Sequence, residues 1–254
     1  MGSPPHSGRY EREDAVARTF DAWVRDGKAT GMERRHRRIT ERMLERFELP
    51  PDSRVLDLGC GDGWAVRLAA RGLTSGAVFG LDVSPEMIFL ARQLSVDLEN
   101  TLFAPGSAAE IPWAENYFTH VLSIESAYYW TDVISAAGEI YRVTAGGGSF
   151  HILMNYYQEN PHSDGWDRET GLPLQRLGAE QWARLFEQAG FERVLTDRIP
   201  DDSPIPPGKA PDELARRQGL QAVGALYVTG RKPCLPEPAS ARRAEAASPF
   251  PILR

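Results

Sequence analysis

One run of ten residues, at positions 54–63, constrains the fold of this chain more than any other. It reads Arg-Val-Leu-Asp-Leu-Gly-Cys-Gly-Asp-Gly, an apolar strand that gives way to three glycines on alternate positions. A helical pattern of apolar residues follows at positions 64–69. A strand that turns through glycine into a helix brings bare backbone, and the free N–H groups of the helix start, up to a ligand. The run therefore predicts an open α/β sheet with a ligand at the carboxyl end of this strand.

The spacing of the glycines distinguishes between classes of ligand. Nicotinamide and flavin enzymes carry Gly-x-Gly-x-x-Gly in this turn, whereas here the third glycine is Gly63 and the next residue is Trp64. An indole at that position prevents the close helix–strand approach that the last glycine of the fingerprint allows. The sequence also lacks the Gly-Lys-Ser/Thr of a phosphate-binding loop after the turn. The turn accordingly favours a nucleoside ligand with a small zwitterionic tail over a pyrophosphate.

An acidic residue about 20 positions after the turn fits the same ligand. The apolar run 77–81 ends at Asp82, which is where an acid reaches the hydroxyls of a ribose. A carboxylate has enough acceptor sites to hold two hydroxyls. Ser84 then provides an N-cap and Pro85 a first helical residue for the helix that follows. We therefore expect Asp82 to bind the ribose, with an ordinary polar strand end as the alternative.

With Asp57, Gly59, Gly61 and Gly63, the first run resembles motif I of the class I S-adenosylmethionine-dependent methyltransferases, Asp/Glu-x-Gly-x-Gly-x-Gly. The resemblance extends over residues 50–200 in motif order. It implies a Rossmann-like, doubly wound α/β fold of seven strands, mostly parallel with an antiparallel last strand. It also implies S-adenosyl-L-methionine as the cofactor. The expected cofactor-binding residues are Asp57, Gly59, Cys60, Gly61, Gly63, Asp82, Val83, Met87, Ser107, Ala108, Ser123 and Glu125.

The loop after the expected third strand, 101–104, departs from the family pattern. In the family this loop often reads Gly-Asp-Ala, and its acid accepts a hydrogen bond from the adenine amino group. Here Ser107 stands in place of that acid. A serine hydroxyl still accepts a hydrogen bond, but it is shorter and uncharged. We therefore expect backbone groups of Ser107 and Ala108 to contribute more of the adenine recognition.

Composition limits the partners of the chain. Its 254 residues, 42% of them hydrophobic, suffice for one α/β domain with a substantial core. A net charge of −6 opposes electrostatic capture of DNA or tRNA, and we interpret the basic run 34–38 as a solvated helix face. The two cysteines, Cys60 and Cys234, form neither a disulfide framework nor a metal-binding pattern, which fits a reducing compartment.

These features predict a cytoplasmic protein that acts on a small molecule. The sequence has no apolar leader and no run long enough to span a membrane. We expect no metal, no nucleic-acid partner and no membrane partner, and the sequence gives no indication of the oligomeric state.

The chain divides into three expected parts. Residues 1–49 carry two helical patterns, which the resemblance implies form a cap over the cofactor. Residues 50–233 form the cofactor-binding domain. Within it, the polar and aromatic segment 155–176 is longer than an ordinary connection, and we interpret it as a substrate lid. Residues 234–254 are rich in Pro, Ala, Arg and Glu, which predicts a flexible tail.

The end of the sheet is predicted as a hairpin. Strands are expected at 191–199 and 222–230, joined by a proline-rich connection without a full crossover helix. Two strands joined in this way pair antiparallel.

Methyl transfer from a sulfonium asks the protein mainly to hold the acceptor atom in line with the methyl group. A base is needed only if the acceptor atom keeps a proton of high pKa. Candidates for that base are His36, Glu125, His151 and His162; for the three histidines the alternatives are a solvent-facing, a structural and an exposed side chain, respectively. An aromatic wall would suit a flat or apolar acceptor and favour the sulfonium through cation–π contact. Its candidates are Tyr10, Trp23, Tyr128, Tyr129, Tyr156, Tyr157 and Trp166.

Three functional classes therefore stay open. The first is S-adenosylmethionine-dependent methyl transfer to a small-molecule acceptor. The second is a non-catalytic module that binds S-adenosylmethionine, which tight cofactor binding without turnover across a broad acceptor panel would distinguish. The third is a nicotinamide oxidoreductase, which the Gly63–Trp64 register opposes and an NADH-binding assay would decide.

Overall fold

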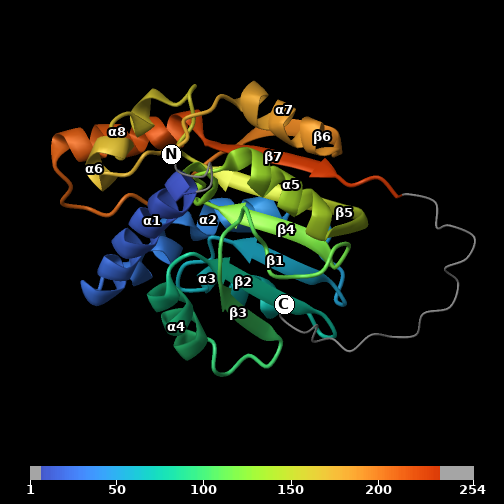
Figure 1. Ribbon diagram of the computed structural model, residues 1–254. Coiled ribbons are helices and arrows are strands. Elements are labelled where there is room, and N and C mark those ends of the chain that lie inside the picture. The colour runs from blue at the N-terminus through green and yellow to red at the C-terminus, as the bar shows by residue number, and fades with distance from the viewer. Residues whose placement is uncertain (1–6, 235–254) are drawn as a thin grey trace, which may run out of the picture.

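The computed structural model describes residues 7–234, which form one seven-stranded sheet flanked by helices (Figure 1). The strand order is β3-β2-β1-β4-β5-β7-β6. Only β7 runs against its neighbours, β5 and β6, and the other pairings are parallel. This confirms the predicted Rossmann-like sheet with an antiparallel last strand. The strands are β1 Arg54–Leu58, β2 Ala77–Asp82, β3 Thr101–Pro105, β4 Phe118–Ile124, β5 Thr144–Met154, β6 Glu192–Ile199 and β7 Ala225–Arg231.

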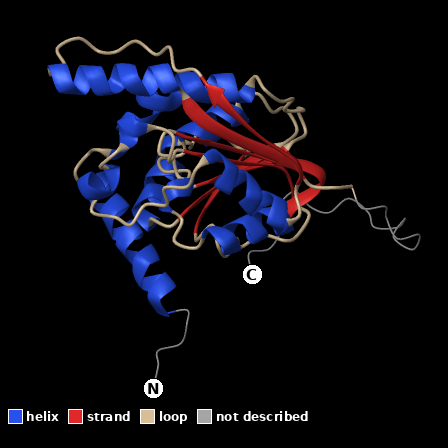
Figure 2. Cartoon of the chain, turned by 90° about the horizontal axis from the view of Figure 1, so that it is seen from above, coloured by secondary structure: helices blue, strands red, loops and turns tan. Residues whose placement is uncertain are grey.

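Helices cover both faces of the twisted sheet, as the view from above shows (Figure 2). The α-helices are α1 Ser7–Arg25, α2 Met32–Leu44, α3 Trp64–Ala70, α4 Pro85–Leu94, α5 Val133–Val143, α6 Trp166–Thr170, α7 Ala179–Ala189 and α8 Pro211–Val223. Short 3-10 helices are η1 Ala29–Gly31, η2 Ala127–Tyr129 and η3 Pro161–Ser163. No helix within residues 7–234 has both the length and the apolar character needed to cross a bilayer.

The core consists of two apolar clusters, one on each face of the sheet. Leu56 and Leu58 of β1 belong to the cluster under α5 and α7, whereas Val55 belongs to the cluster under α2, α3 and α4. This alternation follows from the two-residue repeat of a strand, and burial on both faces is usual for parallel sheets. The order of strands reverses between β2-β1 and β4, so the carboxyl ends of β1 and β4 border the crevice in which such folds bind ligands.

The connection between β6 and β7 differs from the sequence expectation. The two strands pair antiparallel as expected, but the connection contains α8, so the prediction of no full helix there was wrong. Pro211 occupies the first turn together with Asp212 and Glu213, and the helix ends before Gly224, whose φ is 80°. None of its residues is buried, so the helix carries no apolar stripe that a pattern search would detect.

The expected cap and tail are only partly described. Helices α1 and α2 account for the two helical patterns predicted in residues 1–49, although residues 1–6 lie outside the described part. Of the predicted tail, 234–254, the described part contains only Cys234, which is an exposed free thiol. The predicted lid, 155–176, contains η3 and α6.

Candidate active site

A cavity lies at the carboxyl ends of β1, β2 and β4, beneath α1 and α2. It contains about 1040 Å³ of empty space, part of it open to solvent. Its walls come from the glycine turn, the end of β2, the loop after β3, the end of β4 and the two N-terminal helices. The cavity therefore lies where open α/β sheets bind their ligands.

Of the three glycines after β1, two are packed closely against other side chains and one faces the cavity. Gly59, Gly61 and Gly63 have φ values of 73°, 54° and 76°, in the left-handed region that glycine adopts readily. A Cβ on Gly59 would overlap the side chain of Ser126, and one on Gly63 would lie 2.8 Å from the ring of Phe103. A Cβ on Gly61 would meet no protein atom within 4 Å, and Gly61 lines the cavity. The bend is therefore closely packed at Gly59 and Gly63 and faces open space at Gly61.

Asp82 joins the glycine turn to the end of β2. Its Oδ2 accepts a hydrogen bond from the N–H of Gly61 (2.8 Å), and its Oδ1 accepts one from the N–H of Ser84 (2.9 Å). Burial raises the pKa of Asp82 to about 6, although these two hydrogen bonds oppose that rise. The carboxylate is therefore fixed in orientation at the wall of the cavity.

Asp57 lies behind the turn at the end of β1. Its Oδ1 is buried and has no hydrogen-bond partner among the described residues. Burial raises its pKa to about 7, and the charge of nearby Asp82 adds to that rise. A buried carboxyl oxygen without a partner is costly. Together with Asp82 at the cavity wall, this carboxyl behind the turn favours a ligand that carries positive charge.

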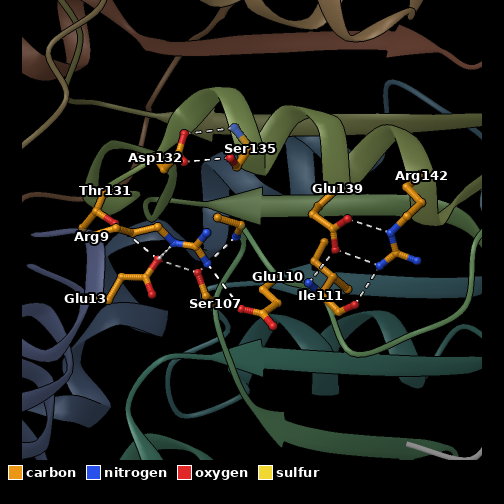
Figure 3. A network of polar contacts seen from close by, with 11 residues as sticks. Arg9, Glu13, Ser107, Glu110, Ile111, Thr131, Asp132, Ser135, Glu139 and Arg142 are labelled. Carbon is orange, nitrogen blue, oxygen red and sulfur yellow. Dashed lines mark hydrogen bonds and ion pairs between the residues drawn. The ribbon is translucent and has the colours of Figure 1, made fainter. Parts of the chain in front are cut away.

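A carboxylate from α1 lies beside Ser107, the residue that replaces the acid of the family pattern. Ser107 donates from Oγ to Oε1 of Glu13 (2.7 Å), and Thr131 donates to the same oxygen (3.3 Å). Arg9 Nε donates to it as well, at 3.1 Å. Figure 3 shows these four side chains pointing toward one another. Glu13 and Ser107 are 94 positions apart, and no motif in the sequence connects Glu13 with the loop after β3.

At the other end of the cavity, Glu125 follows β4 with an unusual backbone. Its φ of 54° is rare for a residue other than glycine, and its N–H donates to the carbonyl of Leu153 at 2.8 Å. Both carboxylate oxygens accept hydrogen bonds, Oε1 from Asn155 Nδ2 (2.8 Å) and Oε2 from Tyr128 Oη (3.1 Å). Burial raises the pKa of Glu125 to about 7, and the two hydrogen bonds limit that rise.

His36 of α2 faces Glu125 across the cavity. Its Nδ1 lies 3.8 Å from Oε1 of Glu125 and has no hydrogen-bond partner among the described residues. Burial, with the charges of Arg35 and Arg217, lowers the pKa of His36 to about 3. At neutral pH the imidazole is therefore uncharged, and the two side chains do not form an ion pair.

Aromatic rings form the wall near this pair. Phe20 contacts Trp23 and Tyr129 edge to face, with ring centroids 5.0 Å apart in both cases. All three line the cavity. Tyr128 lies buried behind Tyr129, and its hydroxyl donates a hydrogen bond to Glu125. The sequence identified Trp23 and Tyr129 but missed Phe20, whose helical spacing indicates a core position as readily as a pocket wall.

Most predicted cofactor-binding residues line the cavity, and three lie directly behind it. The lining ones are Gly59, Cys60, Gly61, Asp82, Val83, Met87, Ser107, Ala108 and Glu125. Asp57 and Gly63 support the turn from behind. Ser123 is buried and shares a 2.6 Å hydrogen bond with Ser126, which donates to the carbonyl of Leu58.

The remaining candidates lie outside the cavity. His151 is buried in the sheet, where its nitrogens meet Ser149 and Tyr227 at 2.8 and 2.6 Å and Phe47 stacks on its ring. His162 lies in η3, against α8. Tyr10 is half-exposed beside a separate shallow hollow.

The aromatic residues of the predicted lid form a second layer. Tyr156 and Trp166 stack on each other behind Tyr128. Tyr157 is buried and donates to the carbonyl of Gly224.

The described residues contain no group of three His, Cys, Asp or Glu side chains placed to hold a metal ion. Comparison with known proteins finds several methyltransferases among the similar proteins. The family model of a methyltransferase domain matches residues 56–152. The chain is 28% identical to methyltransferase phqN of Penicillium fellutanum over 73% of its own length and 61% of that protein's, so it spans less than two thirds of that relative. It is 29% identical to demethylmenaquinone methyltransferase of Geobacillus kaustophilus, over 74% of this chain and 92% of that one.

A solved structure is similar over almost its entire length. It is a chain of the complex between the Haloferax volcanii Trm112 methyltransferase activator and the putative methyltransferase. The TM-score is 0.78 with 32% sequence identity, and the match covers 84% of this chain and 97% of that one.

Proposed function

Because this chain belongs to the class I S-adenosylmethionine-dependent methyltransferases, we propose that it methylates a small-molecule acceptor bound in the cavity beside Glu125. The observation that carries the proposal is the glycine bend. Gly61 leaves open space above it, and its N–H is bonded to the carboxylate of Asp82 at the cavity wall. S-adenosylmethionine supplies a methyl group that is already activated by the positive charge on sulfur.

The residues of the chain bind and orient the two reactants. Asp82 is proposed to accept hydrogen bonds from the ribose hydroxyls, and the backbone at Gly61 to pass close to the amino-acid tail. Val83 and Met87 would flank the adenine, with Ser107 and Ala108 at its edge. The helices of the proposed cap, residues 1–49, contribute walls that shield part of the cavity from water, and such shielding strengthens polar contacts.

The walls favour an acceptor with an apolar body and no negative charge. Phe20, Trp23 and Tyr129 form one side. Acidic side chains line the cavity, but no Lys or Arg does so within the described part of the chain. An anionic acceptor would therefore find no counter-charge there. The relative from G. kaustophilus, named for demethylmenaquinone, agrees with an apolar acceptor. We also propose a cytoplasmic enzyme without a nucleic-acid or membrane partner, in keeping with the net charge of −6.

A turnover assay tests this function. Purified protein is incubated with S-adenosylmethionine and a broad panel of small acceptors, and formation of S-adenosylhomocysteine is measured. We expect acceptor-dependent formation of product. Tight cofactor binding without product for any acceptor would instead favour the non-catalytic binding module.

Affinity for S-adenosylmethionine is expected to rise with pH through the range 6 to 7. The pKa of Asp82 is raised to about 6, and those of Asp57 and Glu125 to about 7, because burial favours their protonated forms. A cationic ligand favours the ionised forms, so binding releases protons and strengthens as pH rises, at most about tenfold per pH unit for each proton released.

Calorimetry in buffers of different ionisation enthalpy measures this proton release. S-adenosylhomocysteine lacks the sulfonium charge, so its affinity should depend less on pH and its binding should release fewer protons. An equal pH dependence for both ligands would contradict the proposed placement of positive charge near these carboxylates.

We propose further that Glu13 replaces the missing acid of the adenine loop. Its Oε1 already accepts from Ser107 and Thr131, and Glu13 lines the cavity. Glu13→Gln is expected to weaken binding of both S-adenosylmethionine and S-adenosylhomocysteine by about 1–2 kcal/mol, because the adenosyl group is common to both. The matched control is Glu110→Gln, in the same loop region but largely exposed. If the two variants bind these ligands with equal affinity, the proposed role of Glu13 in adenine binding is contradicted.

A further inference from the structure

We propose that Glu125 is the general base of this enzyme, that His36 positions the acceptor atom beside it, and that the acceptor is an uncharged aromatic hydroxyl compound. This inference rests on the proposed function, because it concerns the acceptor end of the same cavity. It goes further in selecting one base among four candidate residues and in stating which kind of atom receives the methyl group.

The geometry of Glu125 is that of a side chain held in one place. Its left-handed backbone is unfavourable for a non-glycine residue, by about 1–3 kcal/mol. Such conformations persist where the surroundings fix them, and they are frequent at functional sites. Here the N–H donates to Leu153, and Asn155 and Tyr128 each occupy one carboxylate oxygen. The carboxylate is thus fixed at the end of β4, where it lines the cavity.

The facing atoms of Glu125 and His36 are close enough to contact the same acceptor atom. Oε1 and Nδ1 are 3.8 Å apart, and Nδ1 has no other hydrogen-bond partner in residues 7–234. An oxygen atom at a normal hydrogen-bond distance of about 2.8 Å from each would complete a triangle on that base. In the tautomer with its proton on Nδ1, His36 donates to the acceptor oxygen while Glu125 accepts the hydroxyl proton.

The charged and titratable groups around the pair assign the roles. Glu125 faces His36 of α2 and the two tyrosines of η2, Tyr128 and Tyr129, and the charge of Asp201 beyond β6 also acts on it. Burial brings the pKa of Glu125 to about 7, near the value at which a general base is most effective at neutral pH. The pKa of His36, lowered to about 3, makes the imidazole a poor base and leaves it a hydrogen-bond donor.

The reaction is balanced with these groups alone. The Glu125 carboxylate takes the hydroxyl proton as the acceptor oxygen forms its bond to the methyl carbon. The carbon–sulfur bond breaks, and its electron pair neutralises the sulfonium. The products are a methyl ether, S-adenosylhomocysteine and a protonated Glu125, which returns its proton to water.

The pKa of Glu125 indicates which class of hydroxyl group it can deprotonate during methyl transfer. A phenol has a pKa of about 10, close to that of tyrosine, so a carboxylate with a pKa of about 7 can assist its ionisation in the transition state. An aliphatic hydroxyl is a far weaker acid. The rings of Phe20, Trp23 and Tyr129 would contact an aromatic body. A phenol-type acceptor therefore matches both the pKa of Glu125 and the aromatic lining of the cavity.

The test compares a set of ring-matched acceptors: a phenol, the corresponding aniline, benzylammonium and benzoate. We expect the phenol to be methylated best, with kcat/KM rising through pH 7. Glu125→Gln keeps the size of the side chain but removes the base, and is expected to lower kcat for the phenol by about 10²–10⁴-fold. Its affinity for S-adenosylhomocysteine should stay within about threefold of wild type, as should that of the control Glu110→Gln.

Two further readouts separate a base from a merely structural residue. A phenol whose ring substituents ionise it fully at the assay pH needs no base, so Glu125→Gln should regain most of its rate with that acceptor. Tyr128→Phe removes a hydrogen bond that lowers the pKa of Glu125, so the rise of kcat/KM should move to higher pH. His36→Gln should raise KM without moving that rise.

Opposite outcomes overturn the inference. One is an equal defect of Glu125→Gln with ionised and un-ionised phenols, and another is an unchanged pH profile in Tyr128→Phe. Preferred methylation of benzylammonium would indicate that Glu125 recognises a cation, and preferred methylation of benzoate would contradict the charge of the cavity. Absence of S-adenosylhomocysteine binding by the wild-type protein would instead refute the proposed function itself.

Discussion

Gly61→Val is expected to eliminate binding of S-adenosylmethionine while the protein stays folded. A Cβ at this position would meet no protein atom within 4 Å, so the valine side chain would extend into the space above the bend. The left-handed φ of 54° adds strain of about 1–3 kcal/mol, which a domain of this size can tolerate. Affinity should fall by about 100-fold or more, since each tenfold loss corresponds to about 1.4 kcal/mol. Calorimetric titration, with the thermal midpoint as a measure of folding, checks both parts.

The matched variant is Gly59→Ala. Here the added methyl group overlaps the side chain of Ser126, which itself donates to the carbonyl of Leu58. We therefore expect loss of stability rather than a selective loss of binding, with a lower midpoint of denaturant unfolding. Normal cofactor affinity in Gly61→Val would show that the ligand does not approach the bend.

Asp82→Ala is expected to weaken the binding of S-adenosylhomocysteine by about 1–3 kcal/mol, or about 5- to 150-fold. The variant removes the proposed partner of the ribose hydroxyls and also frees the N–H groups of Gly61 and Ser84, which the carboxylate now holds. Asp82→Asn separates the two effects, because the amide retains one acceptor oxygen. The control is Asp97→Ala, an exposed acid beyond α4. An affinity for Asp82→Ala equal to that of the control would contradict the ribose assignment.

The grouping of the glycine turn and Asp82 at the cavity could be predicted because its signal is local in sequence. Three glycines within five positions and one acid at the end of the next strand are dictated by the strand–turn–helix unit itself. The order and direction of the other strands were expected from the resemblance to the methyltransferase family that these residues carry. The helix α8 could not be predicted because none of its residues is buried, and an exposed helix needs no apolar periodicity.

The acceptor half required the tertiary structure. His36 stands in a basic helical run and His151 in an apolar strand, and neither pattern shows whether the ring nitrogens have partners. In the fold, the nitrogens of His151 are satisfied by Ser149 and Tyr227, whereas Nδ1 of His36 is left facing Glu125. Which nitrogen has a partner depends on how α2 docks on the sheet, and that docking is set by contacts between distant segments.

Glu13 illustrates the same limit. Its contact with Ser107 depends on the placement of α1 against the loop after β3. An acid in the first helix has the same appearance in the sequence whether it faces solvent or the cavity. Similarly, Tyr156 and Trp166 of segment 155–176 pack behind Tyr128 and do not line the cavity. The clustering of aromatic residues in the sequence could not indicate this position.

The central claim is that the open space over Gly61 and beside Asp82 binds S-adenosylmethionine. The most direct test is a calorimetric titration of the wild-type protein with S-adenosylmethionine, S-adenosylhomocysteine and NADH. We predict saturable one-to-one binding of the first two compounds, lost in Gly61→Val, and no heat with NADH. Absence of heat with both adenosyl compounds, or saturable binding of NADH in their place, would contradict the claim.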